Sequence, residues 1–367
     1  MANDIAYGFM TLQDRFQDRV EDVGIEVVSS VMEASFREHD REITAVLDFF
    51  SQPTTSRAEL VRLPGTRIAQ PLADGANPEP TRITGSYEAG YPLRGYGDAY
   101  GMNMVERAYQ TVQDANDWTM EQMKGDLLRM RREILKATIH NAGTAGWTFT
   151  DQPNAADPSV VVRSLANGDT IKYVKTGGTN ETDSHFLAGT AAIGTASTVF
   201  QTIFDELSEH PSNNIAMNGY VLTFVPTNQK SAVEAHNLIK EPTNTLTIPG
   251  ISSDRLLDNP QGLIPFGNQV LGEIDGNLII EWKALPDDVI LSVAPMASSK
   301  PLKRREHEAA NLRGMRTYLT DVDGNNVQFN WRRWLGFGVS NRVSIVMYNV
   351  GNATYTNPTG YDPRSAA

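Results

Sequence analysis

The sequence predicts an α+β fold, and three observations lead to that prediction. Apolar residues recur every three or four positions over residues 9–50 and again over 102–141, as they do along amphipathic helices. Two segments with strand-like alternation, AELVRLPG and RITGSYEAG, lie between those helices. After residue 141, short helix and strand patterns alternate as far as RVSIVMYNV, whose β-branched residues are typical of a strand.

The composition describes a folded chain with an acidic balance. The 367 residues suffice for two or more domains, and 40% are hydrophobic while 21% are charged. No apolar run approaches the roughly 20 residues of a membrane helix. There is no cysteine, which excludes disulfides and thiolate metal sites. The formal net charge of -12 argues against tight binding to nucleic acid, because neutralising phosphates supplies most of that affinity.

Residues 1–56 are predicted to form an N-terminal helical arm. The apolar positions that would share one face of its first helix are Leu12, Phe16, Val20, Val23, Val27, Val31 and Ala34. A second pattern, Ile43, Val46, Leu47 and Phe50, ends at SQPTTS, where proline and hydroxyl side chains break a helix. Because the arm precedes any compact domain, its apolar stripe is expected to cover either the chain's own body or a neighbouring molecule.

Residues 57–101 are predicted to form an extended two-stranded finger. The turn formers PLADGANPEP separate its strands, and an isolated two-stranded ribbon is only marginally stable in water. The end of the finger, YEAGYPLRGYGDAYG, holds Tyr87, Tyr91, Tyr96 and Tyr100 but only one large aliphatic residue. Buried tyrosine is most common where protein surfaces meet, so we expect another molecule to cover these four rings.

Residues 102–141 are predicted to form one long helix with Met123, Leu127, Met130, Ile134 and Ala137 on its buried face. At about 1.5 Å per residue it would span roughly 55–60 Å, more than the width of a compact domain. Further elements are expected in the order strands SVVVRS and TIKYVK, helix STVFQTIFDELSEH, strand NGYVLTFVP, helix TNQKSAVEAHN, a hairpin at Asp275–Gly276, strand DVILSV and a hairpin at Asp323–Gly324.

A search for chemical motifs predicts no catalytic residue, no cofactor-binding residue and no metal ligand. The segment GTAAIGT, residues 189–195, has the glycine spacing of a phosphate loop but carries Thr195 where lysine is required. In DVDGNN, Asn326 and Arg332 occupy positions where a calcium loop needs glycine and glutamate, which favours a hairpin turn. Six histidines, predicted to be surface or packing residues, are scattered singly at His39, His140, His185, His210, His236 and His307. We therefore expect that the protein is not an enzyme and uses no cofactor.

The features that stand out are the arm, the finger and the long helix. They suit one subunit of a shell, whose arm and finger would lie over adjacent copies. In this order the elements resemble the major capsid protein of tailed bacteriophages, the Hong Kong 97 capsid fold, which encapsulin nanocompartments share. The likeness covers nearly the whole chain. It rests on the arm, the finger, the helix MNMVERAYQTVQDANDWTMEQMKGDLLRMRREILKA, the pair STVFQTIFDELSEHPSNNIAMNGYVLTFVP and the ending RRWLGFGVSNRVSIVMYNVGNATY.

The resemblance implies both a domain division and a function. The segments are the N-terminal arm 1–56, the E-loop 57–101, a peripheral domain 102–198 that includes the spine helix, an axial domain 199–311, and returning peripheral strands 312–367. The implied function is self-assembly, as pentamers and hexamers, into the icosahedral head shell of a tailed bacteriophage. That shell would enclose the DNA genome without sequence-specific binding, be assembled in the host cytoplasm and become the virion capsid.

Two departures from the family pattern change what is expected of assembly. Some family members join an E-loop lysine to a neighbour's asparagine, but the first lysine here is Lys124, beyond the finger. That cross-link cannot form in the same way, so the interlocking should be non-covalent. The chain also begins shortly before the arm, so a separate scaffolding protein is expected, with portal and decoration proteins as further partners.

Non-covalent contacts would then depend on side chains of the finger. The candidate inter-subunit contacts are Arg62, Arg67, Arg82, Tyr87, Tyr91, Arg94, Tyr96 and Tyr100. Replacing Tyr91 and Tyr96 together with alanine is expected to impair assembly while leaving the subunit folded. The acidic arm, with Glu21, Asp22, Glu26 and Glu33, is expected to complement the basic stretch Lys303, Arg304 and Arg305. Exposed ion pairs of this kind contribute only about 0–1 kcal/mol each.

Two other functions stay open at this point. An encapsulin-type shell has the same fold, and a cargo enzyme inside it would favour that function over a phage head. A soluble hydrolase whose finger is a lid over an active site belongs to another class. That function requires a pocket in which carboxylates and histidine converge.

Overall fold

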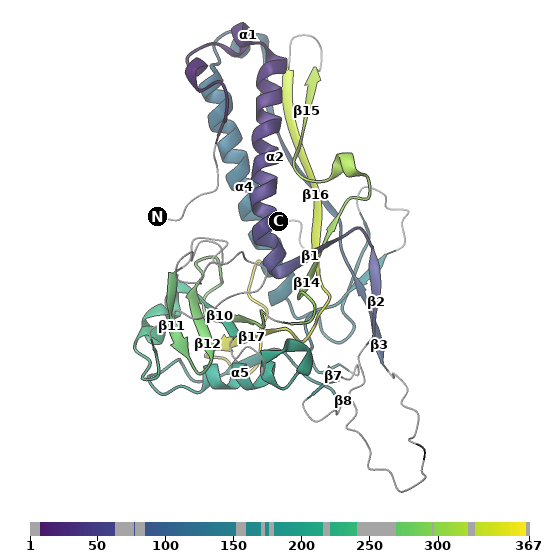
Figure 1. The fold of residues 1–367 in the computed structure, drawn as a ribbon, viewed down its shortest axis with the longest axis vertical. Helices are drawn as coiled ribbons and strands as arrows, with labels where there is room; N and C mark the ends of the chain where they lie inside the picture. The colour runs from purple at the N-terminus through teal and green to yellow at the C-terminus, as the bar shows by residue number, and fades with distance from the viewer. Residues whose placement is uncertain are drawn as a thin grey trace.

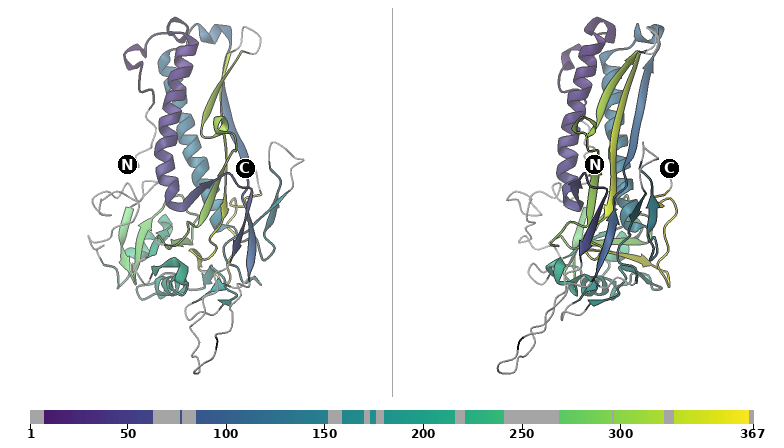
Figure 2. Two further views of the ribbon diagram at one scale, coloured as in Figure 1. Left: turned by 45° about the vertical axis from the view of Figure 1, so that its right-hand side comes forward. Right: turned by 90° about the vertical axis from the view of Figure 1, so that its right-hand side faces the viewer.

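The computed structural model describes residues 8–62, 77, 85–151, 159–169, 173–175, 180–215, 221–240, 269–295, 297–321 and 327–364. They form an elongated upper part, where two long helices lie beside a long pair of strands, and a lower part built on a six-stranded sheet (Figures 1 and 2). Helices and strands are both abundant, which confirms the α+β prediction. Short 3-10 turns occur at Gln13–Arg15, Pro211–Asn213, Thr227–Gln229 and Ala310–Leu312.

The arm consists of a short helix α1 (Val20–Val23) and a long helix α2 (Ile25–Phe50). Gly24 separates them with a φ of 99°, a conformation that favours glycine. Because the helix restarts there, its buried face is shifted by one residue from the predicted one, and Val27 is exposed while Val28 is buried. The buried apolar face of α2 is made of Val28, Met32, Phe36, Ile43, Leu47 and Phe50.

The single long helix predicted over 102–141 is in fact two helices, α3 (Met104–Arg107) and α4 (Val112–Ile139). Asn103 and Thr111 each begin a helix with a capping box, so a second helix start interrupts the run. The 28 residues of α4 span about 42 Å, less than predicted. The predicted buried face is confirmed, since Met123, Leu127, Met130 and Ile134 are buried and Ala137 packs against the same core.

A five-stranded sheet is organised around one long strand, β16 (Val327–Val339). Strand β4 (Arg94–Met102) pairs with residues 327–335 along one edge of β16. On the other edge, β15 (Arg316–Asp321) and β14 (Leu302–Glu306) pair with successive parts of β16. Strand β1 (Ser51–Thr54) adds to β14 in parallel. The antiparallel pairing of β15 with β16 agrees with the hairpin predicted at Asp323–Gly324, whose turn lies outside the described residues.

The six-stranded sheet has the order β11 (Gln269–Ile274), β12 (Asn277–Glu281), β10 (Val221–Val225), β13 (Val289–Val293), β17 (Ile345–Val350), β9 (Phe186–Gly189). Its central strands are buried on both faces. Helix α5 (Val199–Ser208) covers one face with its own apolar cluster, and the other face joins the core of α4. The short helix α7 (Lys230–Glu234) follows β10. The hairpin predicted at Asp275–Gly276 is confirmed, and both of its turn residues have positive φ.

Three small ribbons complete the described fold. They are β2 (Ala58–Arg62) with β3 (Ser86–Gly90), β5 (Trp147–Phe149) with β6 (Val160–Val162), and β7 (Tyr173–Val174) with β8 (Asn180–Glu181). SVVVRS and TIKYVK therefore contain strands, as predicted, but β6 and β7 pair with other partners. The predicted finger is also shorter, because β4 belongs to the five-stranded sheet.

The two sheets do not follow the domain limits predicted at 198/199 and 311/312. Strands β9 and β17, outside the predicted axial segment, belong to the sheet formed by strands within it. Strand β14, inside that segment, pairs with β16 outside it. One apolar cluster also runs through both sheets and both long helices. The chain thus crosses between the two parts several times, which strand patterns alone do not reveal.

Arg333 on β16 connects the two long helices. Its Nε lies 2.8 Å from Asp126 Oδ1 on α4, and its Nη2 forms an ion pair with Asp40 on α2. The other Asp126 oxygen lies 3.2 Å from Nε2 of His39, also on α2. Asp40 further accepts a hydrogen bond from the Met315 amide at 2.7 Å. Helices and sheet are therefore joined through one buried network of charges.

Replacing Arg333 with methionine should destabilise the subunit by about 3–5 kcal/mol, because it leaves the buried Asp126 and the half-buried Asp40 without their cation. Urea unfolding of the dissociated subunit measures this change. The control is Arg37→Met, which breaks an exposed pair with Glu33 on the same helix as Asp40 and should cost about 0–1 kcal/mol. Equal effects of the two substitutions would contradict the importance given to this network.

Candidate functional site

The ribbon β2–β3 is attached to the rest of the subunit at its base, where β2 begins and β3 ends. Arg305 on β14 donates from Nη1 to both oxygens of Asp151, at 2.7 and 2.9 Å, and to the Tyr91 carbonyl at 3.0 Å. Arg57, just before β2, lies 3.2 Å from the same Asp151 carboxylate, and its carbonyl accepts from the Tyr91 amide at 2.7 Å. Both ends of the ribbon therefore share one buried ion-pair network.

Tyr87 and Tyr91 are buried within the subunit itself, with 5% and 0% of their surface exposed. The Tyr87 hydroxyl donates to the Ser340 carbonyl at 2.6 Å, and the Arg342 guanidinium lies 5.3 Å from the ring centroid. The Tyr91 hydroxyl donates to Glu59 at 3.3 Å. The expectation that another molecule covers these two rings is therefore wrong. Segments distant in sequence supply a core for them, with Ala166, Tyr173 and Val343 beside the neighbouring Ala89.

Tyr96 and Tyr100 lie on β4 and are half-buried. Tyr96 packs against the main core, with the Arg129 guanidinium 5.0 Å from its ring centroid. Tyr100 stacks on Trp118 with ring centroids 5.2 Å apart, and its hydroxyl accepts a hydrogen bond from Gln110. Both rings thus pack against the elongated part of the same chain, although each keeps some surface exposed.

The predicted arginine contacts are in three different situations. Arg67 and Arg82 lie outside the described residues. Arg94 is half-buried, donates to the Pro363 carbonyl at 2.5 Å and places its guanidinium 5.0 Å from the Phe149 ring centroid. Arg62, at the end of β2, is exposed. Among the six predicted contact residues that the structure describes, Arg62 alone is exposed.

The basic residues of β14 form ion pairs with acidic residues of the same chain. Lys303 lies 3.5 Å from Glu59, and Arg304 lies 2.9 Å from Glu306. Arg304 and Arg305 are buried. They are therefore not available to the acidic arm of a neighbour, and that part of the expected complementarity is wrong.

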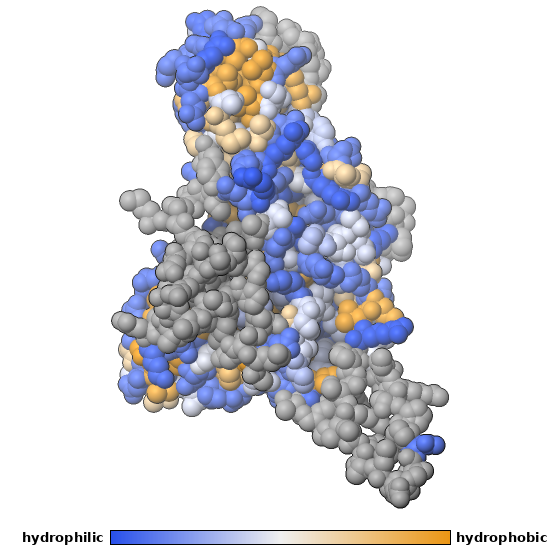
Figure 3. Space-filling model, viewed as in Figure 1, coloured by the Kyte–Doolittle hydropathy of each residue, from blue (hydrophilic) through white to orange (hydrophobic). Residues whose placement is uncertain are grey.

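Exposed apolar residues gather on the elongated part and on the ribbon. The exposed large apolar side chains in the described part are Met10, Val27, Leu60, Val105, Tyr109, Leu128, Leu238, Tyr318 and Leu319. All except Leu238 lie outside the six-stranded sheet and its helices. Figure 3 shows hydrophobic surface at the top of the helix pair and beside β2. Leu60 on β2 is 63% exposed, so the ribbon presents an apolar surface that its own chain does not cover.

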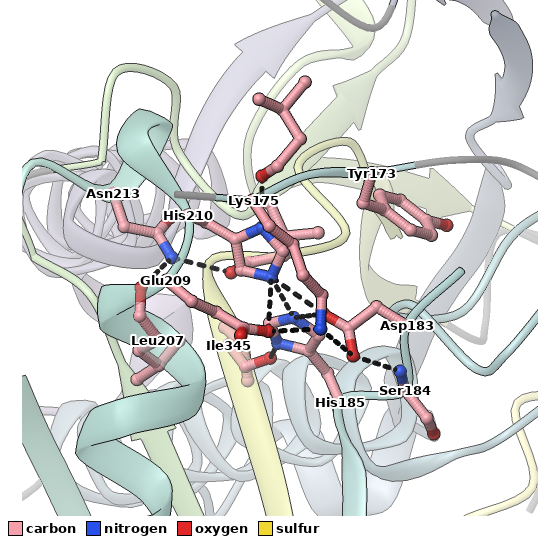
Figure 4. Close-up of polar contacts among 12 residues, drawn as sticks. Tyr173, Lys175, Asp183, Ser184, His185, Leu207, Glu209, His210, Asn213 and Ile345 are labelled. Carbon is pink, nitrogen blue, oxygen red and sulfur yellow. Dashed lines mark hydrogen bonds and ion pairs between the residues drawn. The ribbon is translucent and has the colours of Figure 1, made fainter. Parts of the chain in front are cut away.

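Sequence analysis missed a buried cluster of titratable side chains at the side of the six-stranded sheet (Figure 4). Asp183 and His185 lie just before β9, and His210 follows α5. Nε2 of His210 lies 2.9 Å from Asp183 Oδ2 and 3.0 Å from Nε2 of His185. Lys175 Nζ lies 2.8 Å from Glu209 Oε1 beside them. The histidines are 25 residues apart and share no helix, so their spacing gave no signal.

The electrostatics of this cluster are strongly perturbed. Burial alone would raise the pKa of Asp183, but the close contacts with the His185 and His210 side chains outweigh it and hold that pKa below its usual range. Burial lowers the pKa of His185 despite the nearby Asp183 carboxylate. Burial, and then the charge of Asp183, raise the pKa of Glu206 to about 8. His185 and His210 are almost completely buried, so the cluster does not form an open substrate pocket.

Comparison with known proteins identifies the fold. No family model matches the chain, and no curated protein matches it. A solved chain from Mycobacterium phage Patience is 16% identical, with a TM-score of 0.68, and the match covers 100% of this chain and 99% of that one. A chain from the capsid of a native GTA particle is 12% identical over 84% of this chain and 90% of its own, with a TM-score of 0.47.

The chain has the fold of that phage chain over its whole length. The likeness that the order of elements suggested is therefore confirmed at the level of the fold. Among the described residues, no helix is long and apolar enough to cross a bilayer.

Replacing Tyr91 with alanine should destabilise the subunit by about 3–5 kcal/mol, because it empties a fully buried aromatic site. This corrects the expectation that the Tyr91 and Tyr96 double substitution leaves the subunit folded. Tyr91→Phe keeps the ring and should cost only about 0.5–1.5 kcal/mol for the lost hydrogen bond. Denaturant unfolding of dissociated subunits compares the two variants. An alanine variant as stable as the phenylalanine one would show that the ring does not hold the ribbon base.

Proposed function

We propose that this chain is the structural subunit of the icosahedral head shell of a tailed bacteriophage and that its role is self-association rather than catalysis. The observation that carries the proposal is the whole-length match to a phage chain at a TM-score of 0.68. An encapsulin-type shell is not favoured, since that full-length match is to a chain from a phage. A hydrolase is not favoured either, because the carboxylates and histidines that converge are buried rather than open to substrate.

The distribution of exposed apolar residues supports assembly through the elongated part and the ribbon. We assign the ribbon β2–β3 to the E-loop, and the six-stranded sheet to the axial domain. The elongated part would then be the peripheral domain. Leu60 and Arg62 are both exposed on β2, and we assign them to contacts with a neighbouring copy.

The remaining predicted contacts divide into two groups under this proposal. Arg67, Arg82, Arg94, Tyr96 and Tyr100 stay candidate contacts with neighbouring subunits. Tyr87 and Tyr91 act differently, since their buried rings fix the base from which the ribbon projects. Scaffolding, portal and decoration proteins are further proposed partners, and the enclosed DNA is held without sequence-specific contacts.

Electron microscopy of the purified full chain tests the proposal directly. Expected particles are closed shells, or rings of five or six subunits, at high protein concentration. Sedimentation of the same sample should give species far larger than one chain. A compact monomer at every concentration, with no shell after co-expression with a scaffolding protein from the same phage, would refute the shell function.

The double substitution Leu60→Asp with Arg62→Glu should abolish shell formation without unfolding the subunit. Both side chains are exposed, so their loss leaves the core intact while charge and desolvation oppose docking of a neighbour. Particle counts by microscopy measure assembly, and circular dichroism with thermal unfolding measures folding. The matched control Leu60→Met keeps an apolar side chain and should assemble normally. Normal shells from the charged variant would contradict the role given to the ribbon.

A further inference from the structure

Three hydrogen-bond acceptors converge in the buried cluster described above (Figure 4). Nδ1 of His185 lies 2.8 Å from the Ile345 carbonyl, and Nδ1 of His210 lies 2.7 Å from the Val174 carbonyl. A carbonyl only accepts, so each ring carries its proton on Nδ1 and donates it there. A neutral imidazole therefore presents a lone pair at each Nε2. These two nitrogens and the Asp183 carboxylate face one another.

Three lone pairs at such distances repel unless a cation lies between them. The separations are 3.0 Å between the two Nε2 atoms, 2.9 Å from His210 Nε2 to Asp183 Oδ2, and 3.5 Å from His185 Nε2 to the same oxygen. The rings and the carboxylate are buried, so bulk water does not screen this repulsion. Either an extra proton or a metal ion must supply the positive charge.

The geometry fits a metal ion better than a single proton. Ligand atoms about 2.0–2.1 Å from a tetrahedral zinc ion are about 3.3–3.4 Å apart, close to the three separations in the cluster. One proton bonds well to two acceptors, which leaves the third unsatisfied. Histidine ligands of metals usually donate their other ring nitrogen to a carbonyl or carboxylate, as both histidines do here.

Acidic side chains around the three ligands supply a further donor and a complementary charge. Glu209 Oε1 lies 3.9 Å from His210 Nε2 and 2.8 Å from Lys175 Nζ, so its side chain would have to move toward the histidines to become the fourth ligand. Oxygens of Asp183, Glu206 and Glu209 lie within 4.8 Å of one another. With Lys175, the Asp183 and Glu209 carboxylates leave a formal charge of -1 when the imidazoles are neutral, which a divalent cation offsets.

We propose that Asp183, His185 and His210 bind one structural zinc ion, with Glu209 as the fourth ligand. A nitrogen and oxygen donor set of this kind suits zinc, and structural zinc sites are closed and four-coordinate. Such an ion joins three parts of the chain. His185 leads into β9 beside β17. His210 follows α5, and its ring donates to the carbonyl of Val174 on β7. The zinc ion therefore fixes the small ribbon β7–β8 and α5 to the edge of the six-stranded sheet.

The test uses the full chain in wild-type form and as His210→Gln. Protein is dialysed against a weak chelator, loaded with zinc chloride, freed of excess zinc and measured for metal content by mass spectrometry of the elements. Wild type should retain about one zinc per chain, and added zinc should raise its unfolding temperature by several degrees. His210→Gln should lose both properties. The control His236→Gln, which replaces another buried histidine outside the cluster, should keep both.

A second readout keeps the proposal falsifiable if His210→Gln does not fold. Cobalt chloride added to the metal-free wild type should give the visible absorption of tetrahedral cobalt, and zinc should displace it. Absence of that absorption together with less than a tenth of a zinc per chain would overturn the proposal and leave a shared proton as the stabilising cation. Equal loss of metal in the two histidine variants would also overturn it.

Discussion

The ion pairs of Arg333 with Asp40 and Asp126 are the interaction on which the elongated part depends. A buried guanidinium that faces two carboxylates from different helices fixes the distance of both helices from β16. Because β16 pairs along both of its edges, that distance also sets the positions of β4, β14 and β15. Apolar packing at Phe36, Met123, Met315 and Trp331 fills the space beside this network. Charge thus sets the alignment of the elements, and burial of apolar surface supplies most of the stability.

Most of the aromatic and basic residues that the sequence suggested for contacts between molecules have their partners within the subunit. Aromatic rings of a glycine-rich segment are buried by distant parts of the same chain, and the basic strand β14 finds its acids within the molecule. In the proposed shell, contacts with neighbouring copies would use the exposed apolar side chains of the elongated part and of the ribbon. Each such contact is weak by itself. A shell repeats the same contact many times, so modest interfaces suffice where a single dimer would need a large one.

Much of the fold could be predicted from the sequence because it is encoded locally. Periodicity found α4 and α5, and the Asp275–Gly276 pair identified a hairpin, since both residues accept positive φ. The break before α4 was missed because the capping side chains of Asn103 and Thr111 override a continuous apolar pattern. Strand partners, the burial of Tyr87 and Tyr91, and the meeting of Asp183, His185 and His210 all depend on contacts between distant segments. No spacing rule contains that information.

The base of the ribbon has a mechanical consequence. Arg305 belongs to β14 and donates hydrogen bonds to both the Tyr91 carbonyl and the Asp151 carboxylate. Strand β14 is hydrogen-bonded to β16, and β16 carries Arg333, which holds the two long helices. A pull on the ribbon is therefore transmitted through a continuous series of hydrogen bonds and ion pairs to the far end of the molecule. In the proposed shell, a force that one subunit exerts on the ribbon of the next would reach the long helices of that next subunit, so neighbouring copies would share one curvature.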